Sequence, residues 1–136
     1  MSEVPSVSVI CPSYNHGRHV GDFLRSMLAQ TDPRWELIII DDASTDDNVS
    51  KISLFADSRI KVIVRAHNRG VTAGMNEGVA LSCADLVAFI ASDDVAHPRY
   101  VERVLAAFAN SPSAIAAYVE LDRMGLDGAS MGEPCT

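Results

Sequence analysis

The sequence has 136 residues, of which 48% are hydrophobic, and its formal net charge is −7. A chain of this length can bury a substantial core, and we predict a single domain over residues 1–136. The negative charge argues against nucleic acid as a partner. No apolar run approaches the roughly 20 residues of a transmembrane helix, and the first residues lack a secretory signal pattern. We therefore expect a cytoplasmic protein, either free or at the cytoplasmic face of a membrane.

Strand and helix patterns alternate along the chain. Short apolar segments predict strands at Val7–Cys11, Trp35–Ile40, Ile60–Val64, Leu86–Ile90 and Ile115–Leu121. Apolar residues at helical spacing predict helices over residues 20–28, after residue 45, over residues 72–83 and after residue 98. The strand Leu86–Ile90 shows no polar alternation, so we expect it to be covered on both faces. The segment Gly125–Gly128 predicts a turn.

This alternation indicates an α/β fold with a mostly parallel sheet flanked by helices. In the common doubly wound topology the strands lie in the order three, two, one, four, so that the first and fourth strands are neighbours. Ligands bind such sheets beyond the carboxyl ends of the strands, where the strand order reverses. The loop Pro12–Tyr14 and the acidic pairs Asp41–Asp42 and Asp93–Asp94 would then share one crevice.

Two of the predicted strands lead into pairs of acidic residues. Leu37–Ile40 runs directly into Asp41–Asp42, and Leu86–Ile90 is followed by Asp93–Asp94. A carboxylate at the end of a buried strand is costly unless a cation or hydrogen-bond donors meet it. We therefore expect a divalent metal, a nucleobase or sugar hydroxyls at this edge, with Asp41 in a structural role that caps the loop or the next helix. The four histidines share no metal-binding spacing, and we expect them in loops or on the surface.

Two segments carry a resemblance to a known family: "VSVICPSYNHGRHVGDFLRSMLAQTDPRWELIIIDDASTDD" and "HNRGVTAGMNEGVALSCADLVAFIASDD". They are similar to the nucleotide-sugar-binding half of inverting glycosyltransferases of family 2, and the similarity spans about Val7 to Phe108. The resemblance implies a Rossmann-like GT-A sheet, in agreement with the sheet predicted above. It also implies metal-dependent transfer of a glycosyl group from a nucleoside-diphosphate sugar, of the uridine type, to an acceptor hydroxyl with inversion.

The resemblance assigns the binding of the nucleotide sugar to five matching positions. Pro12, Ser13 and Tyr14 match the loop that packs against the nucleotide base. Asp42 matches the residue that hydrogen-bonds the uracil ring, and Asp93 matches the residue near the ribose. These roles suit the residue types, because a base edge and ribose hydroxyls both need fixed acceptors.

The metal and the diphosphate account for the remaining assignments. Asp94 matches the metal ligand of a DXD-like motif, which implies Mn²⁺ or Mg²⁺ as cofactor to neutralise the leaving nucleoside diphosphate. Arg69 lies in a loop where family members often carry polar or basic residues that face the diphosphate, and a solvated Arg69 is the equal alternative. Met75 stands where the family often has Arg or Lys, so one contact to the donor is lost.

The general base of the family lies downstream of the DXD-like motif, in the acceptor half. Inverting transfer needs such a base to deprotonate the attacking hydroxyl. The late acids are Glu120, Asp122 and Glu133, and none of them lies in a motif that matches the family. We therefore expect no catalytic base in this chain, which would be a truncated donor-binding half with the base downstream of Thr136.

Other classes of protein remain as alternatives. The chain could be a non-catalytic module that binds a nucleotide or a protein partner. A phospho-accepting receiver domain fits poorly, because its acidic pair should follow the first strand, and no GxGxxG motif indicates a dinucleotide-binding domain. For the glycosyltransferase, the expected partners are a nucleoside-diphosphate sugar and an unknown acceptor, which is a sugar, a lipid or a polysaccharide. An incomplete sheet would expose apolar surface, which makes a homo-oligomer a further expectation.

Overall fold

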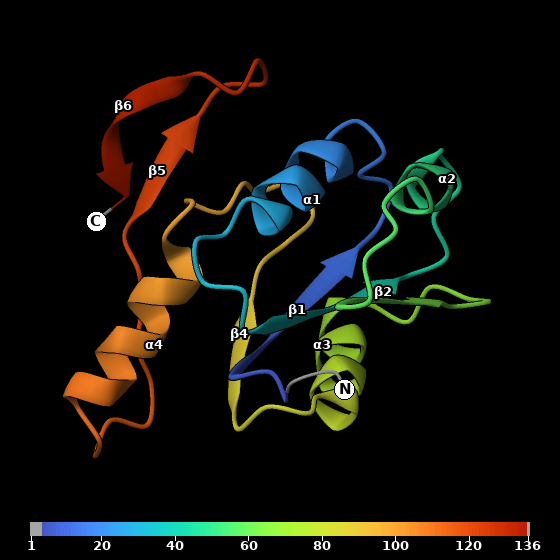
Figure 1. Cartoon of the computed structure of the whole chain (residues 1–136). Coiled ribbons are helices and arrows are strands. Elements are labelled where there is room, and N and C mark those ends of the chain that lie inside the picture. The colour runs from blue at the N-terminus through green and yellow to red at the C-terminus, as the bar shows by residue number, and fades with distance from the viewer. Residues whose placement is uncertain (1–3, 136) are drawn as a thin grey trace. The chain divides into compact units, whose positions relative to one another are not determined.

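A computed structural model describes residues 4–135, with side chains described as far as Met131. The chain forms two compact units, the first extending to Leu105 and the second beginning at Ala106. The first unit contains the sheet and the predicted site, and the second contains the end of one helix and a strand pair (Figure 1). That residues 1–136 act as one domain stays a prediction.

The first unit is built on a four-stranded parallel sheet. Its strands are β1 (Val7–Ser13), β2 (Trp35–Asp41), β3 (Ile60–Val64) and β4 (Leu86–Phe89). Their order in the sheet is β3-β2-β1-β4, which confirms the predicted order three, two, one, four. The register places Ser13 of β1 opposite Asp41 of β2, so that the two strands end together at the carboxyl edge.

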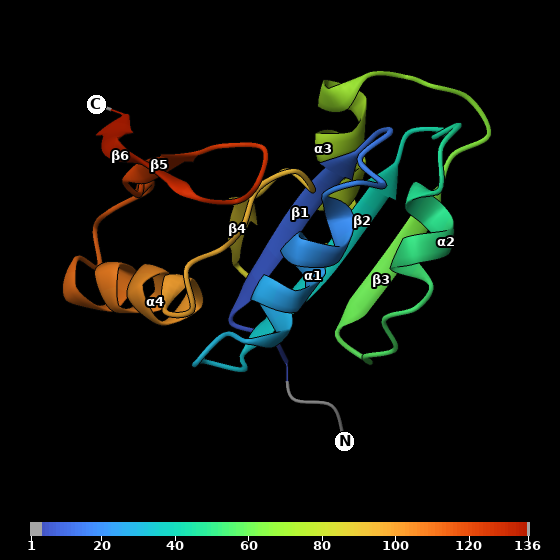
Figure 2. The ribbon, with the colours of Figure 1, turned by 90° about the horizontal axis from the view of Figure 1, so that it is seen from above.

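Helices cover both faces of this sheet. The helices are α1 (Val20–Leu28), α2 (Asn48–Ile52), α3 (Val71–Leu81) and α4 (Tyr100–Asn110). Helices α1 and α2 lie on one face of the sheet and α3 lies on the other (Figure 1, Figure 2). On the first face, Val20, Phe23 and Leu24 of α1 are fully buried against β1 and β2, as the helical spacing predicts.

Small residues let α3 approach the opposite face closely. Gly78 is buried over β1, and a Cβ atom at this position would collide with the side chain of Ile10. Gly74 lies over Ile40 of β2, with 3.5 Å between the position of its missing Cβ and Ile40 Cγ2. The helix predicted over residues 72–83 is therefore confirmed, and it spans Val71–Leu81.

The prediction that Leu86–Ile90 is covered on both faces is wrong. The strand β4 lies at the edge of the sheet, and the side chain of Phe89 is 48% exposed. Leu86 and Val87 are half-buried, and only Ala88 falls below 10% exposure, at 9%. The apolar run identifies the strand correctly, but apolar side chains alone do not distinguish an inner strand from an edge strand.

The second unit contains an antiparallel strand pair, β5 (Leu121–Met124) and β6 (Ser130–Cys135). The predicted turn at Gly125–Gly128 is confirmed, since the Gly128 N–H donates to the Gly125 carbonyl over 2.9 Å. The predicted strand Ile115–Leu121 is wrong, because β5 begins only at Leu121 and Ile115 is 99% exposed. None of the helices in residues 4–135 combines the length and hydrophobicity needed to span a lipid bilayer.

Candidate functional site

The predicted site residues follow the carboxyl ends of three neighbouring strands. Ser13 ends β1, Asp41 ends β2, and Ser92 lies in the chain just after β4. The hydroxyl oxygens of Ser13 and Ser92, which are 79 positions apart, lie 2.7 Å from each other in the interior. The loops after β1 and β4 are therefore joined directly, as the topology predicts.

The loop after β1 is fastened to the loop after β2 by Asn15. Its side-chain oxygen accepts hydrogen bonds from the backbone N–H groups of Thr45, over 2.8 Å, and Asp46, over 3.3 Å. Its own backbone N–H donates to Ser44 Oγ over 2.9 Å. Asn15 adopts a left-handed conformation with φ of 52°, which Asn tolerates better than most residues. Tyr14, next to it, leaves 45% of its surface exposed, so its ring is free to meet a ligand.

Asp41 organises the loop that follows β2. It is fully buried, and its carboxylate accepts hydrogen bonds from the Ser44 N–H and hydroxyl and from Asn48 Nδ2, over 3.0, 2.6 and 2.7 Å. This pattern confirms the expected structural role of Asp41 as a cap of its loop.

Asp42 is occupied by partners within the chain. Its Oδ1 accepts from the Arg69 N–H over 2.8 Å and lies 3.2 Å from Arg65 Nη1, and its Oδ2 accepts from the Gly70 N–H over 2.9 Å. Burial raises the Asp42 pKa, but these donors outweigh burial and hold the pKa below its usual value. A carboxylate has about four acceptor positions, and these three donors fill three of them. Contact between Asp42 and a nucleobase stays a prediction.

Arg65 is a member of the site that the sequence did not reveal. Its side chain is only 6% exposed, and its guanidinium donates to Glu77 of α3 over 2.6 and 2.8 Å, in addition to its contact with Asp42. The network therefore joins the ends of β2 and β3 to α3 and supports the loop that carries Arg69. The side chain of Arg69 is exposed, and its predicted contact with a diphosphate is untested.

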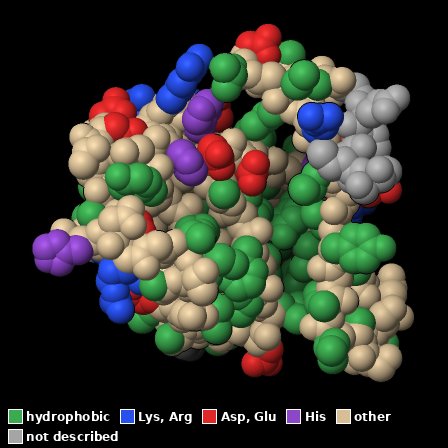
Figure 3. Space-filling model, turned by 180° about the vertical axis from the view of Figure 1, so that it is seen from behind, with side chains coloured by type: hydrophobic (Ala, Val, Ile, Leu, Met, Phe, Trp, Pro, Cys, Tyr) green, Lys and Arg blue, Asp and Glu red, His purple; other side chains and the backbone are tan. Residues whose placement is uncertain are grey.

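Asp93 and Asp94 lie at the surface after β4. Among the described residues, no Lys or Arg forms an ion pair with either carboxylate, and His16 Nε2 lies 3.7 Å from Asp93 Oδ2. The rear view in Figure 3 shows histidine and acidic side chains side by side on the surface. Burial and then the negative charge of Asp93 raise the Asp94 pKa, while the Ala91 backbone and His16 act in the opposite direction. A cation bound here would relieve this repulsion.

This chemistry fits a metal ion that is shared with a ligand. Within the described part of the chain, no three His, Cys, Asp or Glu side chains are grouped closely enough to hold a metal by themselves. Mg²⁺ and related hard cations are often held by one or two carboxylates together with phosphate oxygens and water. Asp94, with Asp93 beside it, could supply such carboxylates, and metal binding here stays a prediction.

A buried polar network lies beneath the acidic pair. Asn48 Nδ2 donates to Ser13 Oγ over 2.8 Å, and Ser92 Oγ lies 2.7 Å from both Ser13 Oγ and His16 Nδ1. Cys11 also lies here, fully buried, and burial raises its pKa well above the usual value, so it is a neutral thiol. His16 and Asn48 were not predicted from the sequence, because the contacts that join them to this network, with Ser92 and Ser13, span 76 and 35 positions of the chain.

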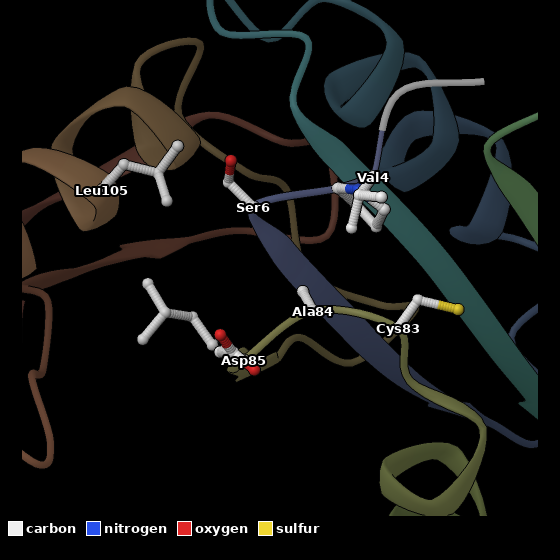
Figure 4. A pocket seen from close by; sticks show the side chains of 8 residues that line it. Val4, Ser6, Cys83, Ala84, Asp85 and Leu105 are labelled. Carbon is white, nitrogen blue, oxygen red and sulfur yellow. The ribbon is translucent and has the colours of Figure 1, made fainter. Parts of the chain in front are cut away.

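A separate hollow lies at the opposite edge of the sheet, near the amino-terminal ends of β1 and β4. It is lined by Val4–Ser6, Cys83–Leu86 and Leu105, as Figure 4 shows for the labelled side chains. None of the predicted site residues lines it.

The fold is that of the nucleotide-sugar-binding half of a GT-A enzyme: a parallel α/β sheet flanked by helices, here with an acidic pair after its edge strand. The family model of glycosyl transferase family 2 matches residues 8–125, and the chain belongs to this family. The family and the GT-A fold predicted from the sequence are thereby confirmed.

Similar proteins cover this chain with only part of their own length. The Escherichia coli UDP-Glc:alpha-D-GlcNAc-diphosphoundecaprenol beta-1,3-glucosyltransferase WfgD is 36% identical over 65% of this chain and 35% of its own length. The putative teichuronic acid biosynthesis glycosyltransferase TuaG of Bacillus subtilis is 39% identical over 66% of this chain and 36% of its own. The structure of S. aureus TarS residues 1–349 in complex with UDP matches with a TM-score of 0.71 and 25% identity, over 76% of this chain and 32% of TarS. The chain thus spans about a third of the length of these relatives.

Proposed function

We propose that this chain is the donor-binding part of a metal-dependent inverting glycosyltransferase. It would bind a nucleoside-diphosphate sugar, with uridine as the nucleoside, whose glycosyl group passes to an acceptor hydroxyl. The observation that carries the proposal is the meeting of the loops after β1, β2 and β4 beside an acidic pair that no Lys or Arg of the described residues neutralises. The UDP complex of TarS and the UDP-Glc donor named for WfgD support uridine.

The nucleotide would be held by the loop after β1 and by the Asp42 network. Tyr14 offers an exposed ring for the base, and Pro12 beside it is half-buried. Ser13 is 2% exposed and its hydroxyl is engaged with Asn48 and Ser92, so it would shape the loop and leave ligand contact to its neighbours. Asp42 would accept a hydrogen bond from the base at its fourth acceptor position.

The acidic pair would receive the ribose and the diphosphate. Asp93 has a side chain that is 47% exposed, as a ribose contact requires. Asp94 would hold Mn²⁺ or Mg²⁺, and the bound metal would neutralise the charge that develops on the leaving nucleoside diphosphate. The raised Asp94 pKa supports this role, because a carboxylate in this environment gains from a neighbouring cation.

The general base would come from the acceptor half of the longer protein. The roughly threefold greater length of the relatives supports this division. Asp122 lies on β5 in the second unit, and the side chain of Glu133 lies outside the described residues. The acceptor would be a hydroxyl of a sugar, a lipid or a polysaccharide.

The test is calorimetric titration of the chain with uridine diphosphate, with and without Mn²⁺. We expect binding that requires the metal and that Asp94→Asn abolishes. Asp85→Asn is the matched control, because Asp85 is an exposed acid before β4 at the opposite edge of the sheet. The proposal fails if the folded protein binds no nucleotide with metal present. Titration with the diphosphates of guanosine, cytidine and adenosine tests the assignment of uridine.

A further inference from the structure

We propose that His16 is a positioning residue for Asp93, held in its Nε2–H tautomer by a buried chain of hydrogen bonds. The chain runs from Asn48 through Ser13 and Ser92 to His16 Nδ1, with donor–acceptor distances of 2.8, 2.7 and 2.7 Å. At the other side of the ring, His16 Nε2 lies 3.7 Å from Asp93 Oδ2. This inference rests on the proposed function for the role of Asp93 in binding the donor.

The direction of the hydrogen bonds starts from Asp41. Its carboxylate only accepts, so the group that lies 2.7 Å from Asp41 Oδ1 must be the NH₂ of Asn48. The second hydrogen of this NH₂ then points at Ser13 Oγ, which lies 2.8 Å away. Ser13 is 2% exposed, and Ser92 Oγ is the one acceptor within hydrogen-bond distance of its hydroxyl among the described residues, so the Ser13 hydrogen is donated to Ser92 Oγ.

The same logic continues to the imidazole. Ser92 is fully buried, so its hydroxyl hydrogen needs an acceptor. The neighbouring Cys11 thiol is a weak acceptor, whereas a neutral imidazole nitrogen at 2.7 Å is a strong one. Ser92 therefore donates to His16 Nδ1. The ring proton must then reside on Nε2, where it faces the Asp93 carboxylate.

The consequence for Asp93 is that an oriented N–H group lies beside its carboxylate. Its side chain is 47% exposed, and among the described residues His16 is its one ion-pair contact, at a separation longer than a hydrogen bond. The ring is itself fixed by buried groups from β1, α2 and the chain after β4. It thus links the loop after β1, which would hold the base, to the acidic pair, which would hold the ribose and the diphosphate.

The tautomer is tested directly by long-range ¹H–¹⁵N correlation of the His16 ring at about pH 8, where a free imidazole is neutral. We expect the Nε2–H pattern in the wild type and a mixture of tautomers in Ser13→Ala. An Nδ1–H pattern in the wild type would overturn the proposal. This measurement needs no nucleotide, so its outcome is independent of the proposed function.

The positioning role is tested with two substitutions at the same residue. His16→Gln keeps an N–H donor near the position of Nε2. His16→Asn can place its amide oxygen near Nδ1 but has no group that reaches the position of Nε2. We expect His16→Asn to weaken Mn²⁺-dependent binding of uridine diphosphate about five- to tenfold, and His16→Gln to stay within about twofold of wild type. We also expect His16→Asn to move the carboxyl ¹³C signal of Asp93 in the free protein.

The controls separate positioning from a loss of structure. His19→Asn and His19→Gln alter a half-buried histidine three positions away and should change neither affinity nor the Asp93 signal. Equal losses of affinity and melting temperature in both His16 variants would indicate a merely structural role and overturn the proposal. If the wild type binds nucleotide and His16→Asn binds as well, the positioning role fails while the proposed function stands. If the wild type binds no nucleotide, the Asp93 carboxyl signal still tests the positioning role: a signal that does not move in His16→Asn would overturn it.

Discussion

The substitution Asp42→Asn tests the buried network that joins β2, β3 and α3. Asn has nearly the same shape as Asp but offers one oxygen and one NH₂ group, so one set of donors around residue 42 loses its acceptor. With the NH₂ group at the position of Oδ2, the Gly70 N–H loses this acceptor and keeps only its longer hydrogen bond to Asn68 Oδ1, over 3.2 Å. The contacts of Arg69 and Arg65 with the remaining oxygen lose their charge assistance. The lost partner costs about 1 kcal/mol, and the weakened contacts cost about as much again. We expect a loss of about 2 kcal/mol in the free energy of unfolding.

Equilibrium unfolding in urea measures this loss. Trp35, the single tryptophan, is 2% exposed at the start of β2 and reports unfolding through its fluorescence. The matched control is Asp22→Asn, which breaks an ion pair with Arg25 whose side chains are both 65% exposed. An exposed pair of this kind contributes about 0.3 to 0.5 kcal/mol. A change below about 0.5 kcal/mol for Asp42→Asn, with an unchanged denaturant slope, would refute the assigned importance of the network.

Two further predictions concern the same sheet. The pKa values of Asp42 and Glu36 lie below their ordinary values of 3.8 and 4.5, because hydrogen bonds and cationic partners outweigh burial. The stability that these two carboxylates contribute is therefore complete above their ordinary pKa values and is lost as the pH falls through the lower pKa values of the folded protein. The melting temperature should fall steeply below about pH 4. It should fall less steeply in Asp42→Asn. Gly78→Ala should destabilise by about 1 to 2 kcal/mol, because its Cβ would collide with Ile10. The control is Gly21→Ala, which should stabilise the protein by up to about 1 kcal/mol, because the added Cβ would meet only the flexible Arg25 side chain at 3.3 Å. Equal effects of the two substitutions in urea unfolding would contradict the packing argument.

The order of the strands could be predicted because it follows from general rules of chain connection. Right-handed crossovers between parallel strands leave few topologies, and the observed order β3-β2-β1-β4 is the common one. The exposure of β4 could not be predicted, because Leu86–Ile90 has the composition of an inner strand and its neighbours are fixed only by the tertiary structure. Ile115–Leu121 failed for a related reason, since apolar residues favour a strand only where another strand is available for pairing.

In the site, too, features set by the local sequence could be predicted, whereas contacts between residues distant along the chain could not. The carboxyl-edge location of the acidic pairs follows from strand direction, and the role of Asp41 follows from its place before Ser44. The partners of His16 and Arg65 are set by contacts across 76 and 23 positions of the chain, and no local pattern marks them. Residues of this kind are found only when the loops are brought together in space.

The buried polar network beneath the acidic pair also costs free energy of folding, and this cost suggests that the network has a role other than stability. Among the described residues, Asn48 Oδ1 is one of two buried side-chain polar atoms without a hydrogen-bond partner, although Asn48 is fully buried. An unpaired buried acceptor costs about 1 to 3 kcal/mol, and an apolar side chain at residue 48 would avoid that cost. Asn48 is nevertheless the group that fixes the direction of hydrogen bonding from Asp41 to His16. A local cost of this kind at the start of α2 is what a site that must hold its polar groups in one arrangement would be expected to show.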